Sequence, residues 1–262
     1  MRIGFIGLGE AGALYAAAAA AHDDTVSGYD PAAPATPEGV ERTADLAGAV
    51  SSADLVVVLT AASLSERIAA DAAPHLRAGA VYADFTTATP ATMEAVERVI
   101  DAAGARFADV AILGPVPAKG ARTETIVSGA AAADVEAWLS ALGAEVERID
   151  GPAGVATSRK LLRSVLMKSL AAVVVEAVTA GRAAGCEPWI REQIAAQLSG
   201  DVEAKIDRYE TGSRKHAVRR SHEMASVVEY LTALEVPSEM SAASERVLQR
   251  LADEEAGGGS RA

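Results

Sequence analysis

Short apolar runs alternate with stretches of helical periodicity over the first 150 residues of the chain. Continuous apolar runs are typical of strands in a parallel sheet, because helices cover both faces of such a sheet. Apolar positions three or four residues apart predict helices between these runs. The predicted strands are 2–6, 25–29, 55–59, 80–84, 106–110, 125–128 and 145–149, and the predicted helices are 12–21, 90–102 and 132–141. This alternation predicts an α/β fold with a parallel sheet.

The pattern changes near Gly151 and Pro152, and no strand is expected beyond this point. Uninterrupted helical periodicity predicts one long helix over 155–184, followed by helices at 189–198, 202–209, 218–234 and 241–252. Residues 1–152 are therefore expected to form one domain and residues 153–256 a small all-α domain. Residues 257–262 begin with three glycines and are predicted to form a disordered tail.

The composition excludes several classes of protein. The 262 residues carry a net charge of −12 at pH 7, and 50% of them are hydrophobic. Intrinsic disorder requires low hydrophobicity, so the chain is expected to fold. A strongly acidic chain binds nucleic acid and anionic membranes poorly, so neither is an expected partner. The single cysteine, Cys186, excludes an intramolecular disulfide and a cysteine-built metal site, and no metal is expected.

The N-terminal segment has only a superficial likeness to an export signal. Met1 and Arg2 precede an apolar run, but Glu10 and four glycines interrupt that run. Neither this segment nor the apolar stretch 170–175 reaches the roughly 18 to 20 residues that span a bilayer. A cytoplasmic protein is expected, which agrees with the reducing compartment that a single cysteine favours.

A glycine-rich motif, G-x-G-x-x-G, lies between the first predicted strand and the first predicted helix. In this context the first glycine permits a tight turn, the second lets the backbone approach a pyrophosphate, and the third lets helix and strand pack closely. The start of the helix then offers N–H groups to the anion. The turn is therefore predicted to bind a dinucleotide through Gly7, Leu8, Gly9, Glu10, Ala11 and Gly12.

Asp30 ends the second predicted strand, 18 residues after Gly12. A carboxylate here hydrogen-bonds the adenosine ribose hydroxyls and repels a 2′-phosphate, and no arginine directly follows it. We therefore expect NAD, with NADP as the open alternative because later loop residues could compensate. Leu59, which ends the predicted strand 55–59, and the next residue, Thr60, are further expected cofactor contacts. The alternative is that the glycines only make turns and Asp30 only ends a strand.

Four segments of the chain resemble those of a known family. They are IGFIGLGEAG at 3–12, DFTT at 84–87, DVAILGP at 109–115 and GPAGVATSRK at 151–160. These segments are similar to those of the β-hydroxyacid dehydrogenases, which include 3-hydroxyisobutyrate and 6-phosphogluconate dehydrogenases. The resemblance covers nearly the whole chain. It implies an N-terminal Rossmann domain followed by an all-α domain, hydride exchange with a nicotinamide cofactor, and a homodimer.

The resemblance also implies roles for individual residues. The family segment that matches 84–87 lies beside the nicotinamide, so Thr87 is an expected cofactor contact. The segment that matches Leu113, Gly114 and Pro115 binds the substrate carboxylate. Leu113 replaces the family's serine, so only backbone N–H groups around Gly114 could bind an anion there.

Lys160 corresponds to the catalytic lysine of the family. A lysine whose pKa is lowered by burial and neighbouring cations can act as general base and general acid. Ser164 replaces the family's asparagine, and Lys168 matches a second lysine found in a less-studied branch. Positions 160, 164 and 168 lie close together on a helix, so Lys160 and Ser164 are expected to be catalytic and Lys168 to bind substrate. The alternative is a solvated cationic helix face.

A basic cluster at 205–222 interrupts the acidic chain, and the segment RRSHEM at 219–224 resembles the short C-terminal domain of the same branch. Arg219 and Arg220 are the expected contacts of a small anionic substrate. The alternative is a solvated helix with local ion pairs. His22 and His75 lack metal-ligand spacing and are interpreted as structural.

The combined interpretation is an NAD-dependent oxidoreductase that acts on a small β-hydroxy acid or its carbonyl form, with Lys160 as general acid and base. A dimer is also expected because the second domain is too small to bury its apolar residues alone. One alternative is an imine reductase on the same scaffold, which Lys160 disfavours. Another is a dinucleotide-binding sensor without turnover, which Leu113 and Ser164 leave open.

Overall fold

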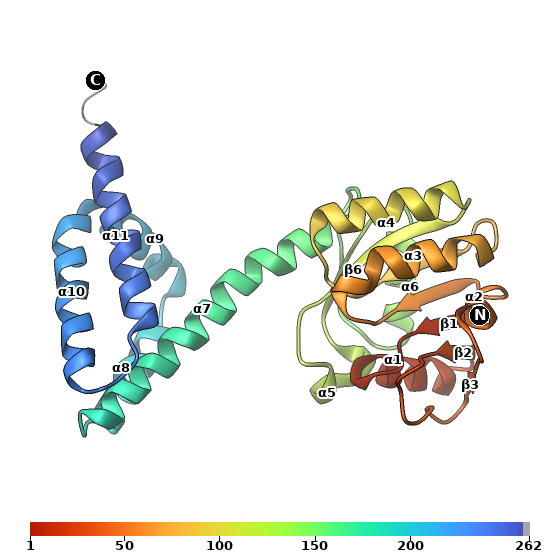
Figure 1. Cartoon of the computed structure of the whole chain (residues 1–262), viewed down its shortest axis with the longest axis horizontal. Helices are drawn as coiled ribbons and strands as arrows, with labels where there is room; N and C mark the ends of the chain where they lie inside the picture. Colours follow the sequence, from red (N-terminus) through yellow and green to blue (C-terminus); the bar gives the residue numbers. More distant parts are fainter. Residues whose placement is uncertain (259–262) are drawn as a thin grey trace. The chain divides into compact units, whose positions relative to one another are not determined.

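The computed structural model describes residues 1–258 of the chain. It divides into two compact units, Met1–Arg163 and a unit that begins at Ser164 (Figure 1). The expected domain boundary, between residues 152 and 153, precedes the long helix α7 (Val155–Ala183), whereas the two units divide within that helix.

The first unit is built on an eight-stranded sheet with the order β3-β2-β1-β4-β5-β6-β7-β8. The strands are β1 (Arg2–Ile6), β2 (Thr25–Tyr29), β3 (Val40–Arg42), β4 (Leu55–Val58), β5 (Val81–Asp84), β6 (Arg106–Ile112), β7 (Thr125–Ser128) and β8 (Val146–Arg148). The order reverses between β1 and β4, and sheets of this kind bind ligands at the carboxyl ends of the strands beside such a reversal. The predicted Rossmann fold is confirmed.

One strand pair departs from the parallel arrangement that the sequence predicts. Strand β7 runs antiparallel to β6, whereas the other neighbouring strands are parallel. The connection between β6 and β7 contains only the short helix α5 (Val116–Lys119) and the 3₁₀ turn η3 (Gly120–Arg122). A parallel pair needs a longer helical crossover, so this connection returns the chain in the opposite direction.

Helices cover both faces of the sheet, and successive strand residues point to opposite faces. In β4, Leu55 and Val57 pack in the cluster that contains α1 (Glu10–Ala21) and α6 (Ala132–Ala141). Val56 and Val58 pack in the other cluster, with α2 (Leu46–Val50), α3 (Ser65–Ala72) and α4 (Pro90–Ala102). Burial on both sides explains why the sequence shows continuous apolar runs here instead of alternation.

The sequence pattern did not predict four short elements, β3, α2, α3 and α5. Strand β3 is an edge strand with the sequence VER, and its side chains are largely exposed, so it shows no apolar run. Helix α3 reads SERIAADA, in which Ile68 is the one large apolar residue. The 3₁₀ turns η1 (Ala62–Leu64) and η2 (Ala73–His75) flank α3. Helix α3 and these two turns form one wall of the candidate site.

The described part of the second unit is entirely helical, as predicted. After the later part of α7 it contains α8 (Glu187–Leu198), α9 (Val202–Lys215), α10 (Ala217–Ala233) and α11 (Glu239–Gly258). Glu176 of α7 accepts hydrogen bonds from the backbone N–H groups of Met240 and Ser241 at 2.8 and 2.9 Å. A carboxylate at a helix start satisfies free N–H groups and offsets the helix dipole, so this contact attaches α11 to α7.

The C-terminal end differs in part from the predicted tail. Gly257 and Gly258 complete helix α11, whereas the sequence predicts disorder from residue 257. The helix-forming stretch before them extends the helix through these two glycines. The rest of the predicted tail, 259–262, lies outside the described residues. Within residues 1–258 no helix is long and apolar enough to cross a bilayer.

Candidate active site

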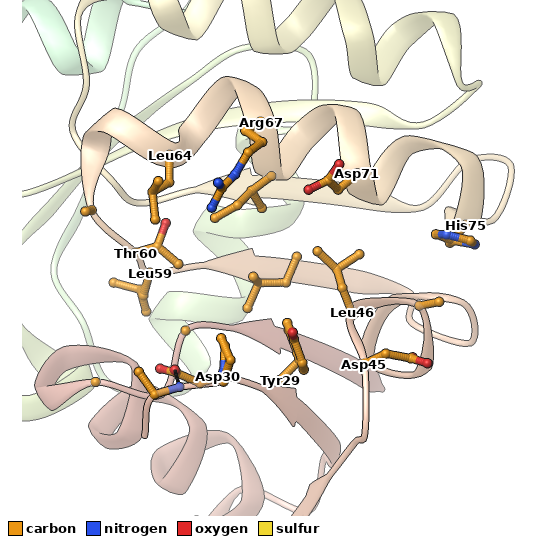
Figure 2. A pocket seen from close by; sticks show the side chains of 18 residues that line it. Tyr29, Asp30, Asp45, Leu46, Leu59, Thr60, Leu64, Arg67, Asp71 and His75 are labelled. Carbon is orange, nitrogen blue, oxygen red and sulfur yellow. Dashed lines mark hydrogen bonds between the residues drawn. The ribbon is translucent and has the colours of Figure 1, made fainter. Parts of the chain in front are cut away.

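A cavity of about 990 Å³ lies at the carboxyl ends of β1, β2 and β4, beside the reversal in strand order (Figure 2). One wall is formed by the end of β2 and the start of α2, with Tyr29, Asp30 and Leu46. The opposite wall is formed by Thr60 and by helix α3 with the turns that flank it. Of the predicted cofactor-binding residues, those that line this cavity are Gly7, Gly9, Asp30, Leu59 and Thr60.

The three glycines of the turn are needed for different reasons. Gly7 has a φ of +96°, and a Cβ there would lie 2.2 Å from the carbonyl oxygen of Leu59. A Cβ on Gly12 would lie 2.1 Å from the carbonyl oxygen of Gly7. Gly9 has a φ of −65°, and no atom lies within 4 Å of the position that its Cβ would take. The fold therefore requires Gly7 and Gly12, whereas Gly9 keeps open a space that a ligand can enter.

Asp30 connects the end of β2 to the glycine turn. Its Oδ2 accepts a hydrogen bond from the Leu8 N–H at 2.8 Å, and its Oδ1 accepts from the Ala32 and Ala33 N–H groups at 2.8 and 3.1 Å. Burial acts to raise the pKa of Asp30, but these donors and Arg42 together hold the pKa below its usual value. The cavity therefore has an ionised carboxylate where the sequence predicts a ribose contact.

Arg42 is a cation beside Asp30 for which the sequence analysis predicted no role. Its Nη2 donates to the carbonyl oxygen of Asp30 at 2.5 Å, and its Nη1 donates to that of Ala33 at 2.9 Å. Arg42 ends β3, a strand without an apolar pattern, so no sequence pattern indicates that it lies near Asp30. The contacts fix the loop that follows β2.

Helix α3 and the turn after it present three charged or titratable side chains to the cavity. Arg67, Asp71 and His75 are spaced four residues apart and line the wall opposite Asp30 (Figure 2). The sequence interpretation of His75 as merely structural did not place it in this wall. Spacing by four would have grouped the three residues on one face if helix α3 had been predicted. In the same cavity, the buried Thr60 hydroxyl has no hydrogen-bond partner among the described residues.

Lys160 and Thr87 lie in direct contact. The Nζ of Lys160 donates to the Oγ1 of Thr87 at 2.5 Å, in a partly buried position. Thr87 has a φ of +57°, a conformation that β-branched residues rarely adopt. Strain of this kind persists only where surrounding contacts impose it, and it concentrates at functional sites. The sequence predicted both residues as site residues but not the contact between them.

Asp109 of β6 binds the start of helix α7. Its Oδ2 accepts from the N–H groups of Gly154 and Thr157 at 2.9 and 3.0 Å, and its Oδ1 accepts from the Thr157 hydroxyl at 2.6 Å. Burial raises the pKa of Asp109, while these donors and the Ser128 hydroxyl act in the opposite direction. Lys160 follows Thr157 within one helical turn, so this carboxylate determines where the lysine side chain begins.

Asp84 of β5 is the neighbour of Asp109 in the sheet register. It is fully buried, its Oδ1 accepts from the Thr86 N–H at 2.8 Å, and its Oδ2 has no partner among the described residues. The pKa of Asp84 is raised to about 6, mainly because the side chain is buried. The Thr86 donors act to lower this pKa, and the nearby Asp109 carboxylate acts to raise it. Two adjacent strands thus carry buried acids at neighbouring positions, Asp84 at the end of β5 and Asp109 in the middle of β6.

The predicted substrate-binding segment offers fewer donors than expected. The Leu113 N–H already donates to the carbonyl oxygen of Glu124 at 2.8 Å, and its side chain packs against a small apolar cluster. Pro115 has no N–H. Of the three predicted residues, Gly114 is the one whose N–H makes no backbone hydrogen bond with the described residues.

The predicted cofactor residues Glu10 and Ala11 begin α1 in the first unit, and the remaining predicted catalytic and substrate-binding residues lie in the second unit. Ser164 is partly buried and Lys168 is exposed on α7. Arg219 forms an ion pair with Glu223 one turn further along α10, and Arg220 donates to Ser213 at 2.9 Å. These local contacts are of the kind that the alternative interpretation predicts, and substrate roles for the four residues stay predictions. Across residues 1–258 no group of three or more His, Cys, Asp or Glu side chains could bind a metal ion.

Two stretches of the chain match known domain families. Residues 2–150 match the NAD binding domain of 6-phosphogluconate dehydrogenase, and residues 182–251 match a domain of unknown function (DUF1932). The first match spans more than half of the chain. Together with the Rossmann sheet and the glycine turn, it defines a nicotinamide-dependent oxidoreductase. The chain belongs to the β-hydroxyacid dehydrogenase family.

Three individual proteins illustrate the similarity. The 2-(hydroxymethyl)glutarate dehydrogenase of Eubacterium barkeri is 24% identical over 223 residues, which are 80% of this chain and 74% of that protein. A conserved protein of unknown function, described as structurally similar to 3-hydroxyacid dehydrogenases, is 28% identical with a TM-score of 0.64 and covers 97% of each chain. A Streptomyces aurantiacus imine reductase is 20% identical with a TM-score of 0.79 and covers 97% of this chain and 95% of that one, a likeness of fold alone.

The glycine variants test whether the cavity is a dinucleotide site. We expect Gly9→Ala to leave the free energy of unfolding nearly unchanged, because its Cβ meets no protein atom. It should weaken NADH binding at least tenfold, since the methyl group enters the pyrophosphate position. Gly12→Ala is the matched control and should lower the melting temperature, because its Cβ clashes with the backbone. Equal NADH affinity in wild type and Gly9→Ala would contradict a ligand role for Gly9.

The raised pKa of Asp84 predicts how stability depends on pH. Because the folded state favours the protonated acid, its stabilising effect is complete below about pH 4 and is lost as the pH rises through about 6. Asp84→Asn removes this titration. Its free energy of unfolding relative to wild type should therefore rise between pH 4 and pH 7, by an amount on the order of 2 kcal/mol. Urea unfolding at several pH values measures the difference, and a constant difference would show that Asp84 ionises normally.

Proposed function

We propose that the chain oxidises a small β-hydroxy acid, or reduces the corresponding carbonyl compound, with Lys160 as general acid and base. The observation that carries this proposal is the contact between Lys160 and the strained Thr87 in a member of the β-hydroxyacid dehydrogenase family. A fixed amine close to a predicted nicotinamide contact is what alcohol oxidation requires, because proton and hydride leave neighbouring atoms of the substrate.

The residues present fit a nicotinamide dinucleotide. The open space at Gly9 and the start of helix α1 suit the pyrophosphate, and Asp30 suits the adenosine ribose. When bound, the nicotinamide ring supplies the chemistry of hydride acceptance or donation at the substrate carbon. The chain itself must place that ring, bind the substrate anion and move the proton.

Lys160 moves the proton in this proposal. Its neutral amine accepts the hydroxyl proton of the substrate as the C–H bond gives up the hydride, and its ammonium returns the proton to the carbonyl oxygen in the reverse direction. The Thr87 hydroxyl accepts one N–H of the lysine and so orients Nζ. The Gly114 N–H and the cations Lys168, Arg219 and Arg220 are our candidates for the substrate carboxylate, and Ser164 for its hydroxyl.

We propose NAD as the preferred cofactor. The carboxylate of Asp30 is ionised and borders the cavity, where it would repel a 2′-phosphate. Arg42 keeps its positive charge beside Asp30 while its guanidinium donates to two backbone carbonyl oxygens, so it offsets part of this repulsion. NADP stays the alternative, since Arg67 lines the facing wall.

We also propose a homodimer located in the cytoplasm. Several large apolar side chains on α7 are exposed in the single chain, among them Leu162 (68%), Val165 (67%) and Leu166 (63%). A contiguous apolar stripe of this kind is typical of a protein interface. A second copy of the chain is the partner that the family resemblance implies.

Lys160→Met tests the proposed acid–base role. We expect kcat/KM for the best hydroxy acid to fall by roughly 10²- to 10⁴-fold, the usual contribution of a positioned general base. The dissociation constant for NADH should change less than twofold. Lys119→Met, on the exposed helix α5, is the control and should behave as wild type. Full activity of Lys160→Met would exclude the proposed role, and turnover of a cyclic imine but of no hydroxy acid would favour the imine reductase alternative.

Cofactor titration tests the role of Asp30. We expect NADH to bind at least tenfold more tightly than NADPH, a difference of about 1.4 kcal/mol. Asp30→Ser should reduce this ratio to near one, because it removes the charge that repels the 2′-phosphate. Quenching of tryptophan fluorescence and calorimetry measure both constants. Tighter binding of NADPH by the wild type would contradict the proposed preference, and binding of neither would contradict the dehydrogenase proposal itself.

A further inference from the structure

Two fully buried polar side chains lie behind the site but outside the cavity. Asp84 ends β5, and Ser65 begins helix α3; both are 0% exposed. Neither lines the cavity, and neither has a part in the chemistry proposed above. Burying polar groups of this kind is costly unless they are hydrogen-bonded, so their partners indicate what they do.

The partner that they share is Thr86. The Ser65 hydroxyl lies 2.5 Å from the Thr86 hydroxyl, and Asp84 Oδ1 accepts from the Thr86 N–H at 2.8 Å. Thr86 is thus fixed through its backbone by a strand and through its side chain by a helix. We name these three residues the Thr86 cluster.

The Thr86 cluster immediately precedes the strained residue of the site. Thr87 has a φ of +57°, a strained conformation that surrounding contacts must offset. Its hydroxyl accepts the N–H of Lys160. Because Thr86 is held at two points, it restricts how the backbone can enter Thr87, whose hydroxyl meets the Lys160 amine.

The cluster also connects this contact to the cofactor cavity. Ser65 is the first residue of α3, and Arg67 and Ile68 of the same turn line the cavity. The position of the α3 wall and the position of Thr87 are therefore linked through one partly buried hydroxyl pair.

We propose that Asp84 and Ser65 are positioning residues, which keep Thr87 where its hydroxyl receives the Lys160 amine and align this contact with the α3 wall of the cofactor cavity. The catalytic consequence rests on the proposed function, whereas the effect on Lys160 can be measured without turnover. A purely structural cluster would affect the folded fraction of the protein but not the surroundings of one lysine.

The test observes Lys160 directly in the full chain. The protein contains five lysines, so labelling with lysine carrying ¹³C at Cε gives few signals, and Lys160→Met assigns the one of interest. We expect Ser65→Ala and Asp84→Ala to move the Lys160 signal toward the shift of exposed lysines. Asp84→Asn should restore the wild-type signal, because its amide oxygen can still accept from the Thr86 N–H.

Thr125→Val is the matched control for loss of a buried hydroxyl. Thr125 is 0% exposed on β7, and its hydroxyl donates to the carbonyl oxygen of Thr123 at 2.9 Å, away from the cluster. This variant should leave the Lys160 signal unchanged. In Ser65→Ala we expect kcat to fall about tenfold or more, the scale of a misplaced catalytic group, with NADH affinity changed less than twofold.

These measurements decide whether Asp84 and Ser65 position Thr87 or only stabilise the fold. An unchanged Lys160 signal in Ser65→Ala would overturn the positioning role, as would an equal change in Thr125→Val. If Asp84→Ala does not fold, Ser65→Ala decides alone. If the wild type oxidises no hydroxy acid but the Lys160 signal responds as expected, the proposed function fails while the positioning role stands.

Discussion

The contact between the buried carboxylate of Asp109 in β6 and the start of helix α7 is the interaction on which the rest of the site depends. A helix begins with N–H groups that have no partner within the helix, and a carboxylate satisfies them while favouring the positive end of the dipole. Asp109 binds two of these groups and the Thr157 hydroxyl from the middle of the sheet. Because Lys160 lies in the next turn, this one contact fixes the lysine relative to β6 and to the strand ends beside it.

The same physical device appears at three strands of the sheet. Asp30 after β2 binds the glycine turn, Asp84 at the end of β5 binds Thr86, and Asp109 of β6 binds α7. In each case a carboxylate accepts from backbone N–H groups of the segment that follows or packs beside it. Burial separates the three: the pKa of Asp30 is lowered at the open cavity, whereas burial raises those of Asp84 and Asp109. Asp30 therefore stays charged at the open cavity, whereas burial disfavours ionisation of the two acids that hold the segments next to Thr87 and Lys160.

The sequence predicted those parts of the molecule that leave a strong local pattern. The glycine turn, Asp30 and most strands were predictable because buried apolar runs and a motif in context are local signals. Strand β3 and helix α3 were missed because one is short and exposed and the other has a single large apolar residue. Arg42 and the α3 wall of the cavity belong to these two elements, so they were not predicted either. The contact between Lys160 and Thr87 joins residues 73 apart, and only the sheet register and the attachment of α7 bring them together.

Amide hydrogen exchange in Asp109→Ala tests most directly whether this carboxylate fixes the lysine helix to the sheet. The account predicts that the Thr157 amide and its neighbours at 155–160 exchange roughly 30- to 1,000-fold faster, equivalent to about 2–4 kcal/mol, while amides of β1 and β2 keep their protection. NADH affinity should stay within twofold of wild type and hydride transfer should be lost. Unchanged exchange at Thr157, or an equal loss of protection throughout the sheet, would contradict the account.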